Sequence, residues 1–349
     1  MLAGVHHWDS NSLDSILPRC LMPVALSPLA GYSLDWFVRG GIDRITVCAN
    51  SATRVVRAVL GGGDSFGASL EYYEDITPRG PAGCLRDVVA ESGAQTLVVA
   101  DGSHIPPFDL NALLAVHRSS NAAMTVVLTS YDPASGLNDG RLRPVGVYVV
   151  EARALQEIPP TGYRDIKEGL IPALREAGEP VLPYVVHDPD YRLSDLAGHL
   201  ATQEYILGRV RRGDLIAADY TRIGDAFVHV RARVDERARL LGSCLIGPHA
   251  RVEGDALVIG PTVIGSHCRI ESGAVVSRSS LWDSSTVFAD AQVDGAVLAY
   301  GVRVRPHGRV CHTVVLPPED YWVPRPQRAV WRRGDASRTA LRRRLAAAP

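Results

Sequence analysis

Aliphatic residues recur at every sixth position through part of the second half of the chain. The run has no miss over nine positions: Val228, Val234, Leu240, Ile246, Val252, Val258, Ile264, Ile270 and Val276. A helix would repeat its apolar positions every three or four residues, and a half-buried strand every two. A period of six is typical of a parallel β-helix, in which each unit supplies a short strand and one corner of a triangular coil. Small residues stand where the corners must bend, at Gly247, Gly254, Gly260, Gly265 and Gly273.

The frame of this repeat shifts by one residue after Val276, because the next aliphatic positions are Leu281, Val287 and Val293. We expect a loop or bulge to interrupt the stack there. The pattern then fades towards the end of the repeat region. A β-sandwich with irregular strands is the alternative, but a repeat at one fixed period favours the β-helix.

Strand-like and helix-like patterns alternate in the first half of the chain. Short apolar runs bounded by turn residues predict buried strands over residues 43–49, 95–100, 124–129 and 146–150. Amphipathic spacing predicts helices over 51–60 and 110–117, the second with Asp109 as its N-cap. This alternation predicts an α/β domain with a mixed, mainly parallel sheet. Ligands of such sheets bind beyond the carboxyl ends of the strands, which directs attention to the loops after Ala100, around 80–84 and before Arg19.

Composition narrows the class of protein. A chain of 349 residues suits two domains, and its net charge of −1 gives no general attraction to nucleic acid or to an anionic membrane. The apolar runs are too short to cross a bilayer, and the first residues lack the pattern of a signal peptide. Six cysteines lie far apart without metal-ligand spacing, which predicts reduced, mostly buried thiols in a cytoplasmic protein.

Several segments resemble the sugar-1-phosphate nucleotidyltransferases, also called NDP-sugar pyrophosphorylases. Leu17-Pro-Arg-Cys-Leu-Met-Pro-Val is similar to their LPKPMLPV segment, and Pro78-Arg-Gly-Pro-Ala-Gly-Cys-Leu to PLGTAGAL. Segments at 40–48, 97–102, 163–174 and 191–197 also resemble the family, in the family's order and spacing. The layout is closest to mannose-1-phosphate guanylyltransferase and glucose-1-phosphate adenylyltransferase.

The resemblance implies three parts. Residues 1–212 would form a Rossmann-like nucleotidyltransferase (GT-A-like) α/β domain. Residues 213–316 would form a left-handed parallel β-helix of hexapeptide repeats, and residues 317–349 a basic tail rich in proline and arginine. The family reaction attacks the α-phosphorus of an NTP with a sugar-phosphate oxygen and expels pyrophosphate, so it depends on positioning and on charge neutralisation.

Some functional positions of the family are retained. Arg19 stands at the position of the catalytic lysine and keeps its positive charge. The small residues Gly80, Ala82 and Gly83 match the turn that binds the nucleotide base. The alternative is that these glycines only make a turn before a helix over residues 85–89.

The carboxylates that hold Mg²⁺ in the family are partly altered. The first family carboxylate falls at Gly102, and Asp101 stands one place early, so it reaches a metal only if the loop rearranges. The second corresponds to Asp195, which is in place. Asp195 is equally consistent with an N-cap for a helix over 196–207. The resemblance implies Mg²⁺ as cofactor if the protein is active and none otherwise.

Two other parts of the family site are reduced. Only Gly4 remains of the glycines in the triphosphate loop, where bulky Val5, His6 and Trp8 follow and the first strand is shortened. We expect His6, His7 and Asp9 to be solvated and not to bind a metal. The EKP segment for the sugar is missing, and Lys167 is too far along the chain to replace it. The remaining sugar-binding positions implied by the resemblance are Gly146 and Tyr148.

Three functions compete for this sequence. We expect lost or much reduced catalysis, with a regulatory or nucleotide-sugar-sensing role in an assembly. The alternative is an active guanylyl- or adenylyltransferase with a rearranged phosphate loop. A third hypothesis is acyl transfer on the β-helix, for which His229, His249, His267 and His307 are available. We expect a nucleotide or nucleotide-sugar ligand, and a homo-oligomer or a hetero-oligomer with an active paralogue. Neither a membrane nor nucleic acid is expected as a partner.

Overall fold

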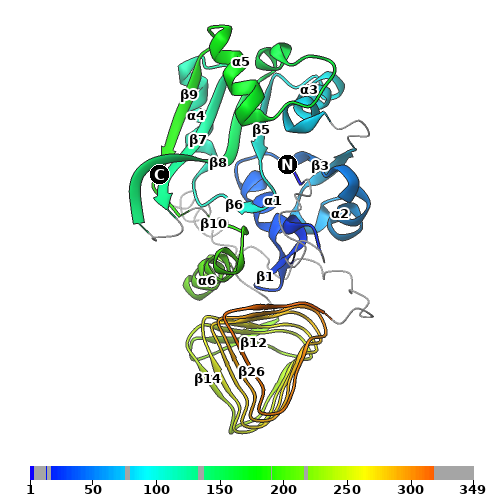
Figure 1. Ribbon diagram of the computed structural model, residues 1–349, viewed down its shortest axis with the longest axis vertical. Helices are drawn as coiled ribbons and strands as arrows, with labels where there is room; N and C mark the ends of the chain where they lie inside the picture. Colours follow the sequence, from blue (N-terminus) through cyan, green and yellow to red (C-terminus); the bar gives the residue numbers. More distant parts are fainter. Residues whose placement is uncertain are drawn as a thin grey trace, which may run out of the picture. The chain divides into compact units, whose positions relative to one another are not determined.

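The chain forms two compact units (Figure 1). The structure is a computed structural model that describes residues 1–3, 13, 17–74, 79–132, 137–189, 191–215 and 219–317. The first unit comprises Met1–Met22 and Pro28–Leu193, and the second comprises Pro23–Ser27 and Ser194–Pro349.

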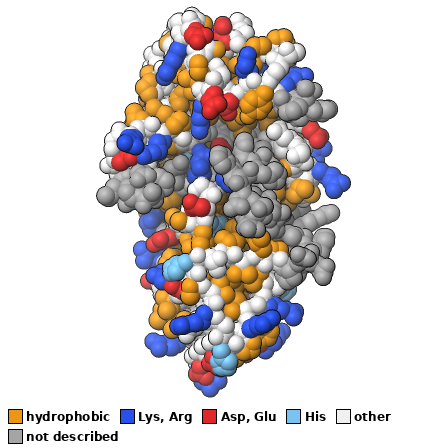
Figure 2. Space-filling view, in the orientation of Figure 1, with side chains coloured by type: hydrophobic (Ala, Val, Ile, Leu, Met, Phe, Trp, Pro, Cys, Tyr) orange, Lys and Arg blue, Asp and Glu red, His pale blue; other side chains and the backbone are white. Residues whose placement is uncertain are grey.

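Charged side chains of both signs are mixed on the face of the molecule in Figure 2. Within the described ranges, no helix is long and apolar enough to cross a membrane. None of the six cysteines forms a disulfide, and five of them are buried while Cys311 is exposed. The expectation of mostly buried cysteines is therefore confirmed.

A mixed sheet forms the centre of the first unit. Its strands are β3 (Arg44–Cys48), β4 (Ser69–Tyr73), β5 (Thr96–Ala100), β7 (Met124–Asp132), β8 (Leu137–Glu151) and β9 (Val181–Val186). β8 pairs antiparallel with β5 and β7, while β9 is parallel to β7 and β3 is parallel to β4. Leu2 makes parallel bridges to Cys48 and to Asp101, so residues 1–3 join the two parts of the sheet. The expected mixed, mainly parallel sheet is confirmed.

Helices and short turns connect these strands. The helices are α1 (Leu29–Arg39), α2 (Thr53–Leu60), α3 (Gly80–Ser92), α4 (Leu110–Ser120) and α5 (Ile171–Glu176). Short strands are β1 (Pro23–Val24), β2 (Ser27–Pro28), β6 (His104–Ile105) and β10 (Tyr191–Arg192). Short helical turns are η2 (Arg19–Leu21), η3 (Asn50–Ala52), η4 (Asp64–Phe66), η5 (Ala152–Glu157) and η6 (Ile166–Leu170). The Asp109 carboxylate caps α4 by accepting the Asn111 N–H at 3.0 Å, as predicted.

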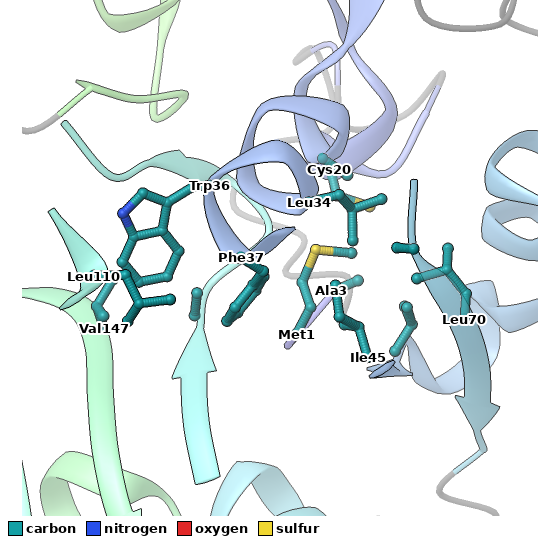
Figure 3. Packing of buried hydrophobic residues seen from close by; sticks show 14 of the residues in the cluster. Met1, Ala3, Cys20, Leu34, Trp36, Phe37, Ile45, Leu70, Leu110 and Val147 are labelled. Atoms are coloured by element: carbon teal, nitrogen blue, oxygen red, sulfur yellow. The ribbon is translucent and has the colours of Figure 1, made fainter. Parts of the chain in front are cut away.

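A hydrophobic core packs one face of the sheet against α1, α2 and α4. Figure 3 shows Met1 and Ala3 lying among Leu34, Phe37 and Ile45. All five side chains are buried. The first three residues therefore belong to the core of the unit as well as to its sheet.

The start of α3 differs from the prediction. Gly80–Gly83 were expected in a turn before a helix over residues 85–89, but they form the first turn of α3 itself. Pro81 lies in this first turn, where its fixed φ suits a helix and its missing N–H costs nothing. The small residues therefore belong to a helix N-terminus.

The second unit is a parallel β-solenoid of about five turns, drawn end-on as a triangle in Figure 1. One side contains β11 (Tyr220–Ile223), β12 (Ala226–His229), β15 (Cys244–Ile246), β18 (Thr262–Ile264), β21 (Ser280–Leu281), β24 (Val297–Leu298) and β27 (Val314–Val315). The second contains β13 (Arg233–Val234), β16 (Arg251–Val252), β19 (Arg269–Ile270), β22 (Thr286–Val287) and β25 (Arg303–Val304). The third contains β14 (Arg239–Leu241), β17 (Leu257–Ile259), β20 (Val275–Ser277), β23 (Gln292–Asp294) and β26 (Arg309–Cys311).

The aliphatic positions of the repeat stack on one another inside the coil. Val228, Ile246 and Ile264 are paired in register along one side, and each of the other two sides stacks its own column. From Ile246 to Val293 these side chains are buried. The predicted β-helix is therefore confirmed.

The expected interruption after Val276 is wrong. Ile264 pairs with Leu281, and Val276 pairs with Val293, so the stack continues. The spacing between paired residues falls from 18 (246 to 264) to 17 (264 to 281, and 281 to 298). The corner between the third and first sides is one residue shorter in each later turn, so all strands stay in register. For the same reason the repeat continues past Val304, where a strict period of six loses it.

Helix α6 (Leu196–Arg212) belongs to the second unit and packs on the solenoid. The side-chain amide of Gln203 donates to the Ser279 carbonyl at 3.1 Å, and the His199 ring lies 6.2 Å from that of Trp282. His199 is 1% exposed, and neither ring nitrogen has a hydrogen-bond partner within the described residues. Burial lowers the pKa of His199 to about 4.

This buried imidazole should make the protein sensitive to acid. Its folded pKa of about 4 lies below the ordinary value of 6.5, so its contribution to stability is complete above pH 6.5 and is lost as the pH falls towards 4. The difference corresponds to about 3 kcal/mol in the free energy of unfolding. Urea unfolding at pH 7.5 and pH 4.5 should show this loss, and His199→Leu should reduce it. The exposed His312 gives the control, His312→Gln. An unchanged pH dependence in His199→Leu would contradict the assignment.

Candidate functional site

The candidate site of the first unit lies where residues 1–3 meet the end of β5. The Leu2 N–H donates to the Ala100 carbonyl at 2.9 Å, and the Gly102 N–H donates to the Leu2 carbonyl at 2.7 Å. Asp101 follows β5 directly, with its N–H donating to the Gly146 carbonyl at 2.9 Å. The backbone of this loop is therefore fixed from both sides at the carboxyl end of the strand.

Both oxygens of the Asp101 carboxylate are engaged within the protein. Oδ1 accepts the Ser103 backbone N–H at 2.9 Å and the Ser103 hydroxyl at 2.7 Å. Oδ2 accepts Nη1 of Arg192 at 2.5 Å. Burial, the largest single influence, raises the pKa of Asp101, but the Arg192 charge and these hydrogen bonds outweigh it and hold the pKa below its ordinary value. Asp101 is therefore an anion that already has a cation beside it.

Arg192 is held in this position by backbone. It lies on β10, which pairs antiparallel with β6 through Arg192 and His104. Its Nη2 donates to the Val145 carbonyl at 2.7 Å. A Cβ at Gly146 would lie 2.8 Å from this nitrogen, and Gly146 has a φ of +79°. The glycine predicted for sugar binding thus leaves room for the guanidinium.

There is little room for a side chain at Gly102, where the family carries its first metal carboxylate. A Cβ at this position would lie 3.2 Å from the Cys20 Cβ and 3.2 Å from the Leu2 carbonyl oxygen. Both neighbours are fixed, one as a buried core residue and the other as part of the sheet. The packing around this loop is therefore adapted to a glycine.

Asp195, the second predicted metal ligand, caps α6. Its carboxylate accepts the Gly198 N–H at 2.8 Å, which satisfies one of the free donors at the helix start. Asp101 belongs to the first unit and Asp195 to the second. Across the described ranges, no group of three or more His, Cys, Asp or Glu side chains is placed to hold a metal. The engaged Asp101 does not fit a Mg²⁺ ligand as it stands.

The predicted nucleotide-binding residues lie at the start of α3 against another segment of the chain. The Ala82 N–H donates to the Arg164 carbonyl at 3.1 Å, and the Arg164 N–H donates to the Arg79 carbonyl at 2.8 Å. A Cβ at Gly80 would lie 2.5 Å from the Arg164 carbonyl oxygen, and a Cβ at Gly83 the same distance from the Arg79 Cβ. Close packing of the backbone thus requires small residues at Gly80 and Gly83. Their predicted role in binding the nucleotide base stays a prediction.

The other predicted residues occupy different surroundings. Arg19 is half-buried and begins the turn η2. Tyr148 lies on β8 in the hydrophobic cluster that also contains Ala82, and burial raises the pKa of its hydroxyl. Lys167 is exposed. Gly4, His6, His7 and Asp9 lie outside the described residues, as does the tail beyond residue 317.

The sequence predicted that the EKP segment for the sugar is absent before Gly146, a position that lies on β8. β8 runs without interruption from Leu137 to Glu151 and passes directly through Gly146 and Tyr148. No loop separates the β7–β8 hairpin from the part of β8 that pairs with β5.

Comparison with known proteins agrees with this fold. The sequence profile of the Nucleotidyl transferase family matches residues 14–137. A mannose-1-phosphate guanylyltransferase of Mycobacterium tuberculosis is 26% identical over 254 residues, covering 66% of this chain and 69% of that protein. A UTP–glucose-1-phosphate uridylyltransferase of Synechocystis sp. is 23% identical over 288 residues, covering 66% of this chain and 74% of that protein.

The chain is a distant homologue of these two nucleotidyltransferases. The predicted roles of Arg19, Gly80, Ala82, Gly83, Gly146, Tyr148, Asp101 and Asp195 stay predictions.

Sequence reasoning missed Arg192 and Ser103. Ser103 lies two residues from Asp101, and such a spacing is typical of a local turn in which an Asp side chain accepts a nearby N–H. Arg192 lies 91 residues from its partner, so no local pattern indicates the pair. The unexpected arginine in the family-like segment 191–197 was the one available signal.

Replacing Gly102 by alanine should destabilise the protein by about 1–3 kcal/mol, since a methyl group would push against Cys20 and Leu2. Gly62→Ala is a matched control, because the nearest atom to a Cβ there is the Asp64 carboxylate at 3.6 Å. Chemical unfolding of both variants measures the difference. Equal stabilities of the two variants would show that the loop after β5 relaxes freely.

Proposed function

We propose that this chain binds a nucleotide or nucleotide-sugar without a divalent cation, and that its catalytic activity is lost or much reduced. Its role would then be to regulate, or to sense a nucleotide-sugar, within an assembly. The observation that carries this proposal is the engagement of Asp101 by Arg192 and Ser103.

The electrostatics of this pair support the proposal. In transfer of a nucleotidyl group, a hard cation held by carboxylates neutralises the charge of the phosphate chain. Here the guanidinium of Arg192 already neutralises Asp101, and a metal would have to displace it from a half-buried position. A guanidinium fixed by the Val145 carbonyl is a permanent cation beside the strand ends where ligands of such sheets bind. Charge compensation for bound phosphate would thus come from the chain itself.

The similarity to nucleotidyltransferases supports the class of ligand. The two relatives are named for transfer of different nucleotides to different sugar 1-phosphates. We therefore propose a sugar-1-phosphate nucleotidyltransferase ancestry and leave the base and the sugar open. Free thiols on all six cysteines are consistent with a cytoplasmic location.

Binding and catalysis are best measured side by side. Pyrophosphate release should stay at background with every NTP and sugar 1-phosphate pair, in Mg²⁺ or Mn²⁺. An NTP or NDP-sugar should raise the melting temperature, with a Kd that changes less than twofold when EDTA replaces Mg²⁺. In Arg192→Gln, the same ligand should bind at least fivefold more weakly in EDTA and regain affinity with Mg²⁺, because Asp101 becomes free.

The exposed Arg118 provides the matched control, since Arg118→Gln removes the same charge from α4 of the same unit. Its binding should equal that of the wild type with and without metal. Pyrophosphate release that requires Mg²⁺ and one particular sugar 1-phosphate, and that is lost in Asp195→Asn, would instead establish the active transferase with a rearranged phosphate loop.

We further propose that the protein is an oligomer, either of identical chains or with an active paralogue. The last turn of the solenoid ends in β25, β26 and β27, each of which pairs with only one strand in the described part of the chain. Exposed strand edges favour association with another chain. Sedimentation at micromolar concentration should give a species at least twice the chain mass of 37.6 kDa. A single species of the chain mass would exclude self-association.

A further inference from the structure

A pocket lies on the solenoid, near its first corner. It has a volume of ≈ 440 Å³ and is lined by Asp219, His229, Val230, Arg231, Pro248, His249 and His267. All of these residues belong to the second unit. The volume lies within the range of small-molecule sites. The pocket therefore has the size of a ligand site that is independent of the α/β unit.

The repeat of the solenoid brings three of these side chains into one column. Val228, Ile246 and Ile264 are paired in register, so the residues three positions further on, Arg231, His249 and His267, occupy equivalent places in successive turns. His249 and His267 both have a positive φ, of 60° and 58°. Their rings stack nearly parallel, with centroids 4.8 Å apart and 11° between the planes.

His229 adds a third imidazole at the first turn. Its Nδ1 accepts the Arg231 backbone N–H at 3.0 Å, so in the neutral ring the proton lies on Nε2. Its ring meets that of Tyr220 edge-on, with centroids 4.9 Å apart. Burial, together with the charges of Arg231 and His249, lowers the pKa of His229. At neutral pH this ring thus offers one N–H donor.

The arrangement of the imidazoles suits an anion better than a metal ion. The stacked rings lie in nearly parallel planes, so their in-plane lone pairs do not converge on one ion as tetrahedral ligands must. Among the described residues, those of this pocket included, no three or more His, Cys, Asp or Glu side chains are placed to hold a metal ion. Parallel N–H donors, by contrast, can each bind a separate oxygen of a phosphate group, as arginine forks do.

The charged side chains around the pocket are compatible with a bound anion. Arg231 is a permanent cation of the column. Asp219 is the carboxylate of the lining, and the nearby Asp283 already accepts the Ser266 N–H at 2.7 Å. An imidazole also carries positive charge whenever it is protonated.

We propose that this pocket binds a phosphate group, either inorganic phosphate or that of a small phosphate monoester. His249, His267 and Arg231 hold the phosphate oxygens and His229 donates through Nε2. Asp219 accepts from a hydroxyl group of the ester. The proposal goes beyond the nucleotide site of the first unit and would give the chain a second, separate ligand.

Titration calorimetry of the full chain with inorganic phosphate, and with a hexose 6-phosphate, tests the proposal. Binding of one or both is expected in the wild type, and the tighter ligand identifies the source of the phosphate. The double variant His249→Asn, His267→Asn should bind at least tenfold more weakly. Asparagine tolerates the positive φ of both positions. Arg231→Gln is a second, independent variant with the same expectation.

His307→Asn is the matched control, because His307 lies at a later corner of the same solenoid with a φ of 55°. Its affinity should stay within twofold of the wild type.

Absence of binding by phosphate and ester in the wild type would overturn the proposal. Equal affinity in the wild type and both pocket variants would also overturn it, as would tight stoichiometric binding of Zn²⁺ that excludes phosphate.

Discussion

The backbone of Leu2 joins two parts of a sheet that otherwise share no strand pairing among the described residues. On one side β3 and β4 pair with each other, and on the other β5, β8, β7 and β9 form a four-stranded group. Hydrogen bonds from residues 1–3 to Cys48 and Ala100 close the gap. The helices α1, α2 and α4 pack on this joined surface, with Met1 and Ala3 inside the core. The same bridge fixes the position of the loop at Asp101, because the Gly102 N–H donates a hydrogen bond to the Leu2 carbonyl.

This constraint links the residues at positions 101, 102 and 192 of the candidate site. With Cys20 and Leu2 fixed against Gly102, a carboxylate there would require the sheet to move. The anion is Asp101 instead, where it accepts donors from Ser103 and Arg192. Breaking a half-buried ion pair leaves one charge without a partner, which is more costly than the pair is stabilising. The glycine at position 102 and the guanidinium of Arg192 therefore reinforce each other.

The sequence predicted the solenoid correctly because its pattern is periodic. It did not predict features that depend on contacts between particular residues. The aliphatic spacing gave the solenoid, since one buried residue per side is all the coil requires. The aliphatic spacing wrongly predicted an interruption after Val276. A strict period of six cannot represent a corner that is one residue shorter in every later turn. The start of α3 was misplaced because glycines read as a turn, although Pro81 and the Arg164 backbone stabilise a helix there. The pair Arg192–Asp101 joins residues 91 positions apart, which no local pattern encodes.

Each turn of the solenoid contacts only the turns before and after it, so the domain behaves as a one-dimensional stack. Its stability is the sum of the intrinsic stability of each turn and of the interfaces between neighbouring turns. A local unfolding event at one end therefore affects distant turns less than adjacent ones. The histidine column lies in the first turns, whereas β25, β26 and β27 lie in the last. Events at the two ends are thus separated by several intervening turns at about 4.8 Å each. Such a chain can gain or lose a partner at its last turn while the histidine column in its first turns keeps its conformation.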